Sequence, residues 1–501
     1  MSVQIRPAAI AGLQVREFEM LIDGQWTSGA GGVIERVAPG HGVLVSRYQA
    51  ATEVDANRAI AAARKAFDTG PWPRMTGAER SNTLLRAADL IAANAEELAW
   101  FDAVEAGKPI AQTRGELGGA VDIWRYAAAL ARDLHGESYN TLGDGTLGVV
   151  LREAIGVVSI ITPWNFPFLI VSQKLPFALA AGCTAVVKPS ELSSGSTLLL
   201  GKLLIEAGIP AGVVNIIAGT GAAVGSLMTS HRDVDMVSFT GSTGVGKLTM
   251  RNSSETLKKV SLELGGKNPQ IVFADANLEE FADAAVFGAF FNAGECCNAG
   301  SRLILHKSIA EEAIARISAL SAKVKVGDPL NDETQVGAII TPMHFDKVTG
   351  HVAAAQAAGA GVAYGGGALD LGAGQFMAPT IVSGVTPDMA IAREEVFGPV
   401  LSVLTFETLD EAVEIANDVD YGLSAGVWSA GMDNCLSVGR RVRAGTVWMN
   451  TFMDGASELP FGGYKQSGLG RELGRHAVED YTETKTLNMH IGARTNWWVQ
   501  R

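Results

Sequence analysis

The chain of 501 residues lacks the features that would place it in a membrane, on nucleic acid or outside the cell. It has no run of about 20 apolar residues, and its N-terminal segment lacks the charged-then-apolar order of a signal peptide. No basic cluster offsets the formal net charge of −13, which excludes the basic face that a nucleic-acid protein needs. We therefore expect a cytoplasmic protein that binds neither membrane nor nucleic acid.

Cysteine is also scarce. Four cysteines in a chain of this length do not form a disulfide framework, and two of them, Cys296 and Cys297, are adjacent. In a reducing compartment they are free thiols, and we interpret Cys183 and Cys435 as small buried hydrophobic residues. The chain has no internal repeat with a period of 20–50 residues, and we expect no metal site.

The hydrophobic periodicity indicates an α/β fold. Residues from about 53 to 135 carry apolar side chains at spacings of three and four, which predicts a layer of helices. From Ile155 onward, short β-branched runs alternate with helical segments, and a second such series begins after Gly266. This alternation is typical of parallel sheets with crossover helices. We predict two open parallel-sheet α/β domains: a Rossmann-like domain from residues 1–134 and 155–264, and a second domain from residues 265–466.

Two polar, strand-like segments, 135–154 and 480–495, do not fit either domain. The first contains the turn signal Gly143-Asp144-Gly145. An exposed β-ribbon leaves unpaired edges unless a partner subunit covers them. We therefore predict an oligomerisation arm, which a monomeric mass at working concentration would contradict.

Three stretches place reactive or polar side chains where predicted strands end. The stretch FFNAGECCNAGSR holds Cys297, LELGGKNP holds Glu263, and PWNFP holds Asn165. Ligand sites in open α/β sheets lie at the carboxyl ends of the strands. Each stretch alone also fits a plainer interpretation: a buried thiol, a solvated capping carboxylate and a turn residue.

Together these stretches resemble the aldehyde dehydrogenase superfamily. The blocks PWNFP, KPSE, FTGSTGVG, LELGGKNP, the cysteine block, EEVFGPV and PFGGYKQSGLGRE occur in the family's order between about residues 20 and 490. The spacing 297 − 263 = 34 also fits the family pattern. The resemblance implies that residues 1–134 and 155–264 bind the cofactor, that residues 265–466 are catalytic, and that the chain forms a homodimer or homotetramer.

The resemblance also implies NAD-dependent oxidation of an aldehyde to its carboxylic acid. The family's nucleophile is a Cys followed by any residue, a small residue and Gly, which selects Cys297 over Cys296. The oxyanion formed by thiolate attack would be stabilised by the Asn165 side chain and the Cys297 backbone N–H. Loss of hydride to NAD leaves a thioester, and Glu263 would activate the water that hydrolyses it. Lys174 and Glu472 match positions of a proton relay, although a surface ion pair is the plainer interpretation.

Two glycine-rich turns are candidates for holding NAD. The stretch 219–225 has glycine spacing one residue too long for the dinucleotide fingerprint and also fits an ordinary turn. The stretch 241–246 opens a helix whose N-terminus could cradle pyrophosphate, and the resemblance favours it, with Ser242 beside the phosphate. The resemblance places Lys188 and Glu191 at the adenine ribose, where a carboxylate favours NAD over NADP. The other residues it places around NAD are Thr162, Pro163, Trp164, Ser190, Gly221, Gly225, Phe239, Thr240, Gly241, Leu264, Gly265, Glu395 and Phe397.

Motif positions also outline a substrate tunnel. Its expected lining is Phe166, Ile170, Gln173, Phe452, Gly455, Leu459 and Phe461. Enzymes for aliphatic and aromatic aldehydes tend to be more aromatic at the positions of Gln173 and Gly455, so we expect a wider, more polar mouth. Asp454 and Glu458 in the same loop could attract a cationic aldehyde, or they could simply be solvated acids.

Glu295 departs from the family pattern, because many relatives carry Gln there. A carboxylate directed at Cys297 would raise the pKa of the thiol, and we expect it to point away into a salt bridge.

Rival functions fit the residues less well. A Cys-dependent hydrolase or acyltransferase needs a His base, and none of the eight histidines lies in a motif-like block. The CoA-acylating branch of the family typically lacks the general-base Glu, which is present here as Glu263. A non-catalytic relative would not need Cys297, Glu263 and Asn165 together.

Overall fold

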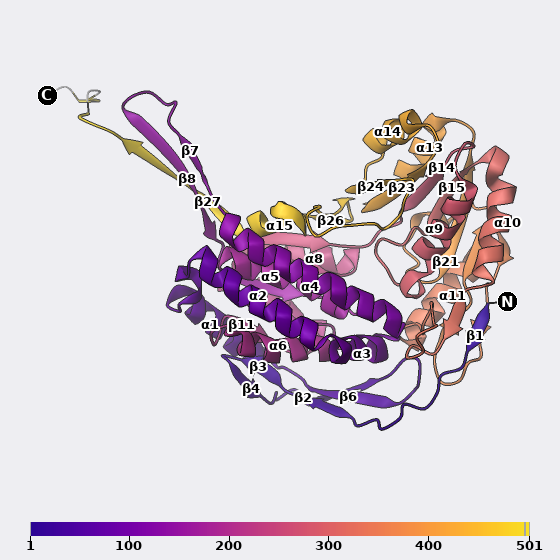
Figure 1. Cartoon of the computed structure of the whole chain (residues 1–501), viewed down its shortest axis with the longest axis horizontal. Coiled ribbons are helices and arrows are strands. Elements are labelled where there is room, and N and C mark those ends of the chain that lie inside the picture. Colours follow the sequence, from indigo (N-terminus) through magenta and orange to yellow (C-terminus); the bar gives the residue numbers. More distant parts are fainter. Residues whose placement is uncertain (1, 495–496, 500–501) are drawn as a thin grey trace.

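The computed structural model describes residues 2–494 and 497–499. Figure 1 shows two α/β lobes beside each other and a β-ribbon that projects away from the first lobe. Residues 1 and 495, which end two of the predicted regions, lie outside the described residues. Both lobes are built on open, mostly parallel sheets, so the predicted fold class is confirmed.

The first lobe contains an eight-stranded sheet in the order β26-β13-β12-β9-β10-β11-β3-β4. The five central strands are parallel. Along this sheet the chain runs outward from β9 in one direction through β10 and β11 and in the other through β12 and β13, which creates a topological switch point beside β9. The strands are β3 (Met20–Ile22), β4 (Gln25–Thr27), β9 (Val157–Ile161), β10 (Thr184–Lys188), β11 (Val214–Ile216), β12 (Met236–Thr240), β13 (Lys259–Glu263) and β26 (Gly468–Leu469).

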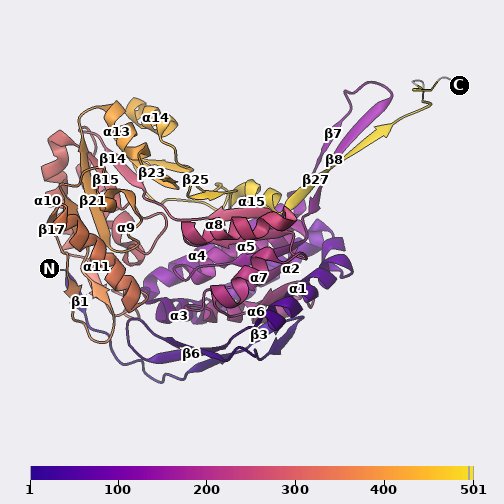
Figure 2. The same cartoon turned by 180° about the vertical axis from the view of Figure 1, so that it is seen from behind.

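Helices cover both faces of this sheet. Alternate residues of β9 face opposite sides, so Val158 and Ile160 pack with one layer of helices and Val157 and Ile161 with the other. One layer contains α2 (Gly77–Ala93), α3 (Ala95–Ala106), α4 (Ile110–Asp133), α5 (Pro167–Ala181) and α6 (Gly195–Ala207). The other contains α1 (Glu53–Asp68), α7 (Ser226–Ser230) and α8 (Thr243–Ser253), which come to the front in Figure 2. The helices predicted between residues 53 and 135 are therefore present.

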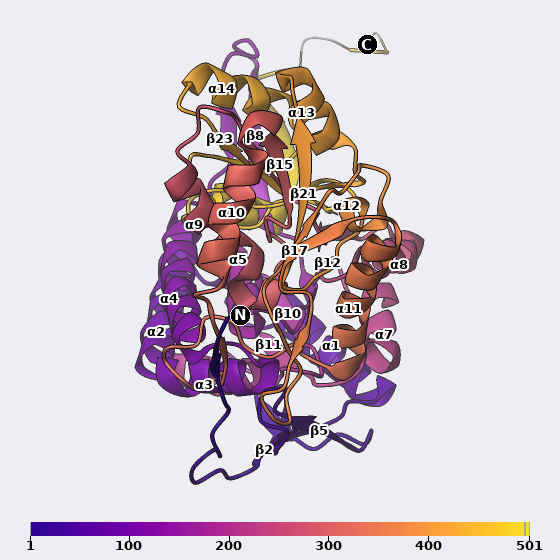
Figure 3. The same ribbon diagram turned by 90° about the vertical axis from the view of Figure 1, so that its right-hand side faces the viewer.

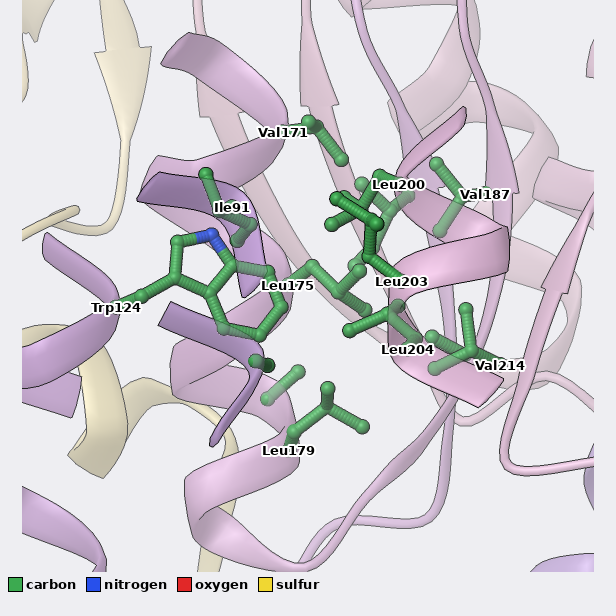
Figure 4. Packing of buried hydrophobic residues seen from close by; sticks show 14 of the residues in the cluster. Ile91, Trp124, Val171, Leu175, Leu179, Val187, Leu200, Leu203, Leu204 and Val214 are labelled. Atoms are coloured by element: carbon green, nitrogen blue, oxygen red, sulfur yellow. The ribbon is translucent and has the colours of Figure 1, made fainter. Parts of the chain in front are cut away.

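The core between α4, α5, α6 and the sheet fixes the position of α5. Figure 4 shows Trp124, Leu175 and Leu200 converging from three helices. The indole N–H of Trp124 donates to Ser172 Oγ at 3.0 Å, so its polar atom is satisfied in the apolar interior. Burying each such apolar side chain stabilises the fold by about 1.5–3 kcal/mol, so α5 is fixed in position against the sheet. The loop between β9 and α5 is therefore held at both of its ends.

The second lobe contains a seven-stranded sheet in the order β17-β20-β21-β15-β14-β23-β24, in which only β17 is antiparallel. Figure 3 shows α9 and α10 on one side of these strands and α11 on the other. The strands are β14 (Pro269–Val272), β15 (Arg302–His306), β17 (Gly361–Tyr364), β20 (Thr380–Ser383), β21 (Val400–Phe406), β23 (Ser424–Trp428) and β24 (Thr446–Met449). The helices are α9 (Leu278–Phe290), α10 (Ala310–Ser321), α11 (Pro342–Ala357), α12 (Ala390–Arg393), α13 (Leu409–Asn417) and α14 (Met432–Arg441).

The two polar, strand-like segments form strands that pair with each other. β27 (Thr482–His490) runs antiparallel to β8 (Thr146–Ala154) along its whole length, and β7 (Glu137–Tyr139) pairs with the other edge of β8. The remaining elements are β1 (Val3–Ile5), β2 (Arg16–Phe18), β5 (Val33–Val37), β6 (Leu44–Gln49), β16 (Lys325–Gly327), β18 (Ala368–Leu369), β19 (Phe376–Met377), β22 (Tyr421–Gly422), β25 (Tyr464–Lys465) and α15 (Gly474–Asp480). None of the helices within residues 2–494 and 497–499 is both long and apolar enough to cross a bilayer.

Candidate active site

The cysteine loop of the second lobe meets the carboxyl edge of the first sheet. After β13, the Asn268 side chain donates to the carbonyl of Cys297 at 2.7 Å and to that of Ala299 at 2.9 Å. Gly266 lies against the same loop, because a Cβ atom there would be 2.6 Å from the Cys297 carbonyl oxygen. The loop that carries Cys297 is thus held directly beside the end of β13, as the motif positions predict.

Asn165 approaches this loop from the end of β9. Its side-chain nitrogen donates to the Glu295 carbonyl at 3.0 Å, and the residue is buried. An amide nitrogen carries two hydrogens, so one remains for a ligand beside the cysteine loop. Asn165 and the Cys297 loop therefore lie together.

Asn292 shapes the cysteine loop, and sequence reasoning missed it. Asn292 and Ala293 both adopt left-handed backbone conformations, with φ of 55° each. This conformation is uncommon for residues other than glycine. The Asn292 side chain compensates by donating to the carbonyls of Asn165 at 3.1 Å and Glu295 at 2.9 Å. The signal in the sequence is an Asn just before an Ala-Gly pair, which is typical of a chain reversal.

The two adjacent thiols have different surroundings. Cys296 is buried with Phe166, Ile170 and Ala299, whereas Cys297 is only partly buried. A contact with the Cys296 thiol, burial, and the charges of Glu395 and Glu263 raise the pKa of Cys297 well above its ordinary value. Cys297 is thus the more accessible thiol, and both carboxylates lie close enough to act on it.

Cys183 and Cys435 are both fully buried, which confirms their interpretation as core residues.

Glu263 ends β13 as an isolated buried carboxylate. Neither of its oxygens has a hydrogen-bond partner among the described residues. Burial, followed by the negative charge of Glu472, raises the pKa of Glu263 well above its ordinary value. A raised pKa in a buried carboxyl group is suited to a general base that works near neutral pH.

Lys174 and Glu472 form a buried ion pair near Glu263, so the alternative of a surface pair is wrong. Lys174 Nζ also donates to Ser238 Oγ at 3.2 Å, and Ser238 Oγ accepts a second hydrogen bond from the Tyr481 hydroxyl at 3.1 Å. Ser238 and Tyr481 were missed by sequence reasoning because neither belongs to a recognisable motif. The structure joins the four side chains in one chain of polar contacts.

Glu395 and Phe397 lie near one another beside the cysteine loop. The Gly266 N–H donates to Glu395 Oε1 at 2.9 Å, and burial raises the pKa of Glu395 to about 7. Phe397 adopts a φ of 59° and packs edge-on against Trp164 with ring centroids 5.5 Å apart. The structure therefore brings Trp164, Glu395 and Phe397 together.

The residues predicted for the adenine ribose lie at the end of β10. Lys188 Nζ donates to the carbonyls of Pro189 and Gly219 at 2.9 Å each and lies 3.7 Å from a carboxylate oxygen of Glu191. Lys188 is buried, whereas the Glu191 side chain is 35% exposed and open to a ligand. Ser190 is buried beside them and accepts a hydrogen bond from the Leu192 N–H.

Both glycine-rich turns open at the same edge of the sheet. Gly221 and Gly225 bound a π-helical turn before α7, and a Cβ atom at either would meet nothing within 4 Å. Ser242 is the N-cap of α8 and accepts from the Val245 N–H at 3.4 Å. The other predicted cofactor residues are found on these strand ends and loops, namely Thr162, Pro163, Phe239, Thr240, Gly241, Leu264 and Gly265.

The predicted tunnel residues divide into two groups. Phe166 and Ile170 pack with Cys296 and Ala299 next to the cysteine loop. Gln173 and Phe461 are half-buried, and Gly455 and Leu459 are exposed.

Phe452 does not join that cluster. Its ring lies against Trp448 and in the space left by three glycines, Gly288, Gly300 and Gly426, inside the second lobe. Its neighbour Met453 packs against the Phe166 cluster instead. The expectation that Phe452 faces the tunnel is therefore corrected in favour of Met453. The acids of the same loop are both exposed, and Asp454 accepts a hydrogen bond from Thr451.

The Glu295 carboxylate is buried and accepts a hydrogen bond from the Ile340 N–H at 3.0 Å. Its other neighbour is His344, with Nε2 at 3.8 Å. Burial raises the pKa of Glu295 and lowers that of His344. The Glu295 carboxylate therefore has a hydrogen bond from the backbone and, for the expected salt bridge, only His344 at ion-pair distance.

Comparison with known proteins agrees with this geometry. The model of the "Aldehyde dehydrogenase family" matches residues 26–487. A betaine aldehyde dehydrogenase from Bacillus subtilis is 41% identical over 96% of this chain and 99% of its own length. The crystal structure of an NAD-dependent aldehyde dehydrogenase from Sinorhizobium meliloti is 50% identical, with a TM-score of 0.98 over 99% of each chain. A betaine aldehyde dehydrogenase from Staphylococcus aureus in complex with NAD+ is 36% identical, with a TM-score of 0.94 over 96% of each chain.

Proposed function

The chain belongs to the aldehyde dehydrogenase family, and from that premise we propose that it oxidises an aldehyde to its carboxylic acid with NAD, through a covalent intermediate on Cys297. The observation that carries this proposal is the position of the partly exposed Cys297 thiol. It lies beside the Asn165 loop and within reach of the charges of two carboxylates, the buried Glu263 and the half-buried Glu395. A nucleophile, an oxyanion donor and a base are the parts that thioester chemistry requires.

The residues present fit NAD. Glu191 offers an exposed carboxylate to a ribose, and the open N-terminus of α8 at Ser242 suits a pyrophosphate. A Cβ atom at Gly265 would clash with Glu395 Oε2, so a side chain there would displace this carboxylate. NAD supplies the hydride acceptor when bound, with its nicotinamide ribose at Glu395. We accordingly assign residues 1–134 and 155–264 to cofactor binding and residues 265–466 to catalysis.

Acylation depends on Cys297 and Asn165. The partly exposed Cys297 thiol loses its proton to solvent, and the thiolate attacks the aldehyde carbon. The second Asn165 side-chain hydrogen and the Cys297 N–H stabilise the resulting oxyanion. Collapse of this thiohemiacetal re-forms the carbonyl bond as the carbon loses hydride. The two electrons pass to NAD, and Cys297 retains the acyl group as a thioester.

Deacylation depends on Glu263. Its ionised carboxylate takes a proton from water, the hydroxide attacks the thioester carbon, and the carbon–sulfur bond breaks to release the carboxylic acid and the Cys297 thiolate. Glu263 must then lose the proton it has gained. We assign the buried Lys174–Glu472 pair, linked to Ser238, to receiving this proton.

A turnover assay tests this function. With an aliphatic aldehyde and NAD, we expect NADH and free carboxylic acid to form in a ratio of one to one without CoA. We also expect kcat/KM to be higher with NAD than with NADP, because the Glu191 carboxylate repels a 2′-phosphate. NADH formation without free acid, or a higher kcat/KM with NADP, would contradict the proposal.

The pH dependence of deacylation tests the position of Glu472. Because Glu263 must be ionised to act, the deacylation rate should rise with pH through its raised pKa. Glu472→Gln removes a negative charge that raises this pKa and leaves the Lys174 cation in place, so the rising limb should move to lower pH. The pre-steady-state release of NADH in the same variant serves as the acylation control. If the rising part of the pH–rate profile of deacylation stayed in place or moved to higher pH, Glu472 would not act on Glu263.

The β-ribbon supports a proposal about assembly. β7, β8 and β27 project from the first lobe, and β27 is exposed over nearly its whole length. Such an edge favours strand pairing with another chain. We assign residues 135–154 and 480–494 to an arm that joins copies in a homodimer or homotetramer.

A further inference from the structure

The side chain of a buried lysine, Lys108, contacts the backbone of Asn165. Lys108 is the middle residue of the three-residue connection between α3 and α4 and is 2% exposed. Gly107 ends α3 in a left-handed conformation with φ of 77°, and Pro109 is the N-cap of α4. This Gly-Lys-Pro junction fixes the backbone on both sides of Lys108 and directs its side chain inward.

The Lys108 ammonium has three neighbours around the active-site loop. Its Nζ donates to the Asn165 carbonyl at 2.5 Å, lies 2.9 Å from Glu116 Oε1, and lies 3.7 Å from the centroid of the Phe166 ring. An ammonium group has three hydrogens to donate and no acceptor. Its donor positions are thus directed to the Asn165–Phe166 backbone turn, the Glu116 carboxylate and the Phe166 ring face.

The same network reaches the cysteine loop. Gln112 donates to Glu116 Oε1 at 2.7 Å and accepts from the Asn292 N–H at 3.2 Å. Asn292 in turn donates to the Asn165 carbonyl. The Asn165 carbonyl therefore receives two hydrogen bonds, and both donors are tied to one side of α4. This continuous path joins the loop after β9 to the loop that carries Cys297.

A buried ion pair is weak evidence for stability, because an apolar pair of similar volume is often as stable or more so. Such a pair is better explained where one of its charged groups holds another residue in place. Here the Lys108 ammonium holds the Asn165 carbonyl, while the Asn165 side-chain amide is held by the Glu295 carbonyl.

We propose that Lys108 is a positioning residue whose ammonium fixes the Asn165 main chain and thereby aims the Asn165 amide at the substrate oxyanion. This proposal rests on the function proposed above. A displacement of about 1 Å at such a donor can cost about 100-fold in rate. Without Lys108, acylation should slow by about 10- to 100-fold, while NAD affinity should change little because Lys108 lies away from the nucleotide-binding turns.

The double variant removes both members of the ion pair, and only its control keeps the buried ammonium without a carboxylate partner. In Lys108→Met/Glu116→Gln the donor to Asn165 is lost, whereas the matched control Glu116→Gln retains Lys108 and an acceptor for Gln112. Each is made with Asn165 intact and in an Asn165→Ala background. The rate of the NADH burst measures acylation, and NAD affinity and thermal unfolding are measured alongside.

A role through Asn165 requires strong coupling between the two sites. Relative to its control, the double variant should slow the burst about 10- to 100-fold with Asn165 intact and less than about threefold in the Asn165→Ala background. An equal slowing in both backgrounds, or none in either, would overturn the proposal.

If Asn165→Ala alone left the burst rate unchanged, the oxyanion role in the proposed function would fail and the positioning role with it. If Asn165→Ala slowed the burst and the double variant did not, only the positioning role would fail.

A second variant covers the case in which Met at position 108 prevents folding. Lys108→Gln/Glu116→Gln keeps a polar side chain that is too short to reach the same carbonyl. It should show the same coupling to Asn165→Ala, and independence of the two changes would again overturn the proposal.

Discussion

Replacing Cys297 by Ala is expected to lower NADH formation from an aldehyde by at least about 10⁴-fold, since loss of the nucleophile removes the covalent step on which the other groups depend. Asn165, Glu263 and Glu395 lie near this position, but none of them supplies a thiol that can form the thioester. NAD affinity, measured by fluorescence titration, should stay within a few-fold of the native value. The loss therefore appears in kcat rather than in cofactor binding.

Cys296→Ala is the matched control, because it removes the adjacent thiol. Cys296 is buried among Phe166, Ile170 and Ala299, so its thiol is less accessible than that of Cys297. Turnover in this variant should stay within about tenfold of the native rate, with a modest loss from the cavity that the truncation leaves. If Cys296→Ala abolished turnover and Cys297→Ala did not, the nucleophile would be misassigned.

Replacing Glu263 by Gln is expected to leave a burst of about one NADH per active site followed by a stall, with steady-state turnover reduced roughly 10²- to 10⁴-fold. Gln has nearly the same shape but cannot accept a proton from water. Acylation does not need this carboxylate, so hydride transfer proceeds once and the thioester accumulates. Stopped-flow absorbance of NADH resolves the two phases.

Glu472→Gln is the control for the Glu263 experiment, because it alters the neighbouring relay and leaves the base in place. It should show the burst and then continue to turn over. A Glu263→Gln enzyme with no burst would instead show that Glu263 acts before or during hydride transfer.

Strand ends and motif residues were predictable from the sequence for a local reason. The run VVSII of β9 is β-branched and buried on both faces, which is the signal of a central parallel strand. The loop that follows a parallel strand must emerge at the carboxyl edge of the sheet. Asn165 and Glu263 were therefore placed correctly at this edge from their positions after strand-like runs.

Partnerships between distant segments were not predictable. Lys108 and Asn165 are 57 residues apart, so only the packing of the lobe decides that they meet. Lys174 and Glu472 are 298 apart, and the family resemblance, not a local pattern, named them together. No local periodicity records such a contact.

The direction of side chains in loops could also not be predicted from the sequence. Asn450 and Met453 adopt φ values of 54° and 64°, which turn the loop on both sides of Phe452. These left-handed residues direct the Phe452 ring into the space left by three glycines and bring Met453 toward the Phe166 cluster. Neither conformation is implied by the residue types, since positive φ is uncommon outside glycine.

The mass of the stalled Glu263→Gln enzyme tests the central claim most directly. After one burst with NAD and an aldehyde, rapid acid quenching and peptide mass mapping should find about one acyl group per chain, on the peptide that carries Cys297, and hydroxylamine should remove it. A burst of NADH with no acyl group on that peptide, or with the group on another residue, would contradict the account.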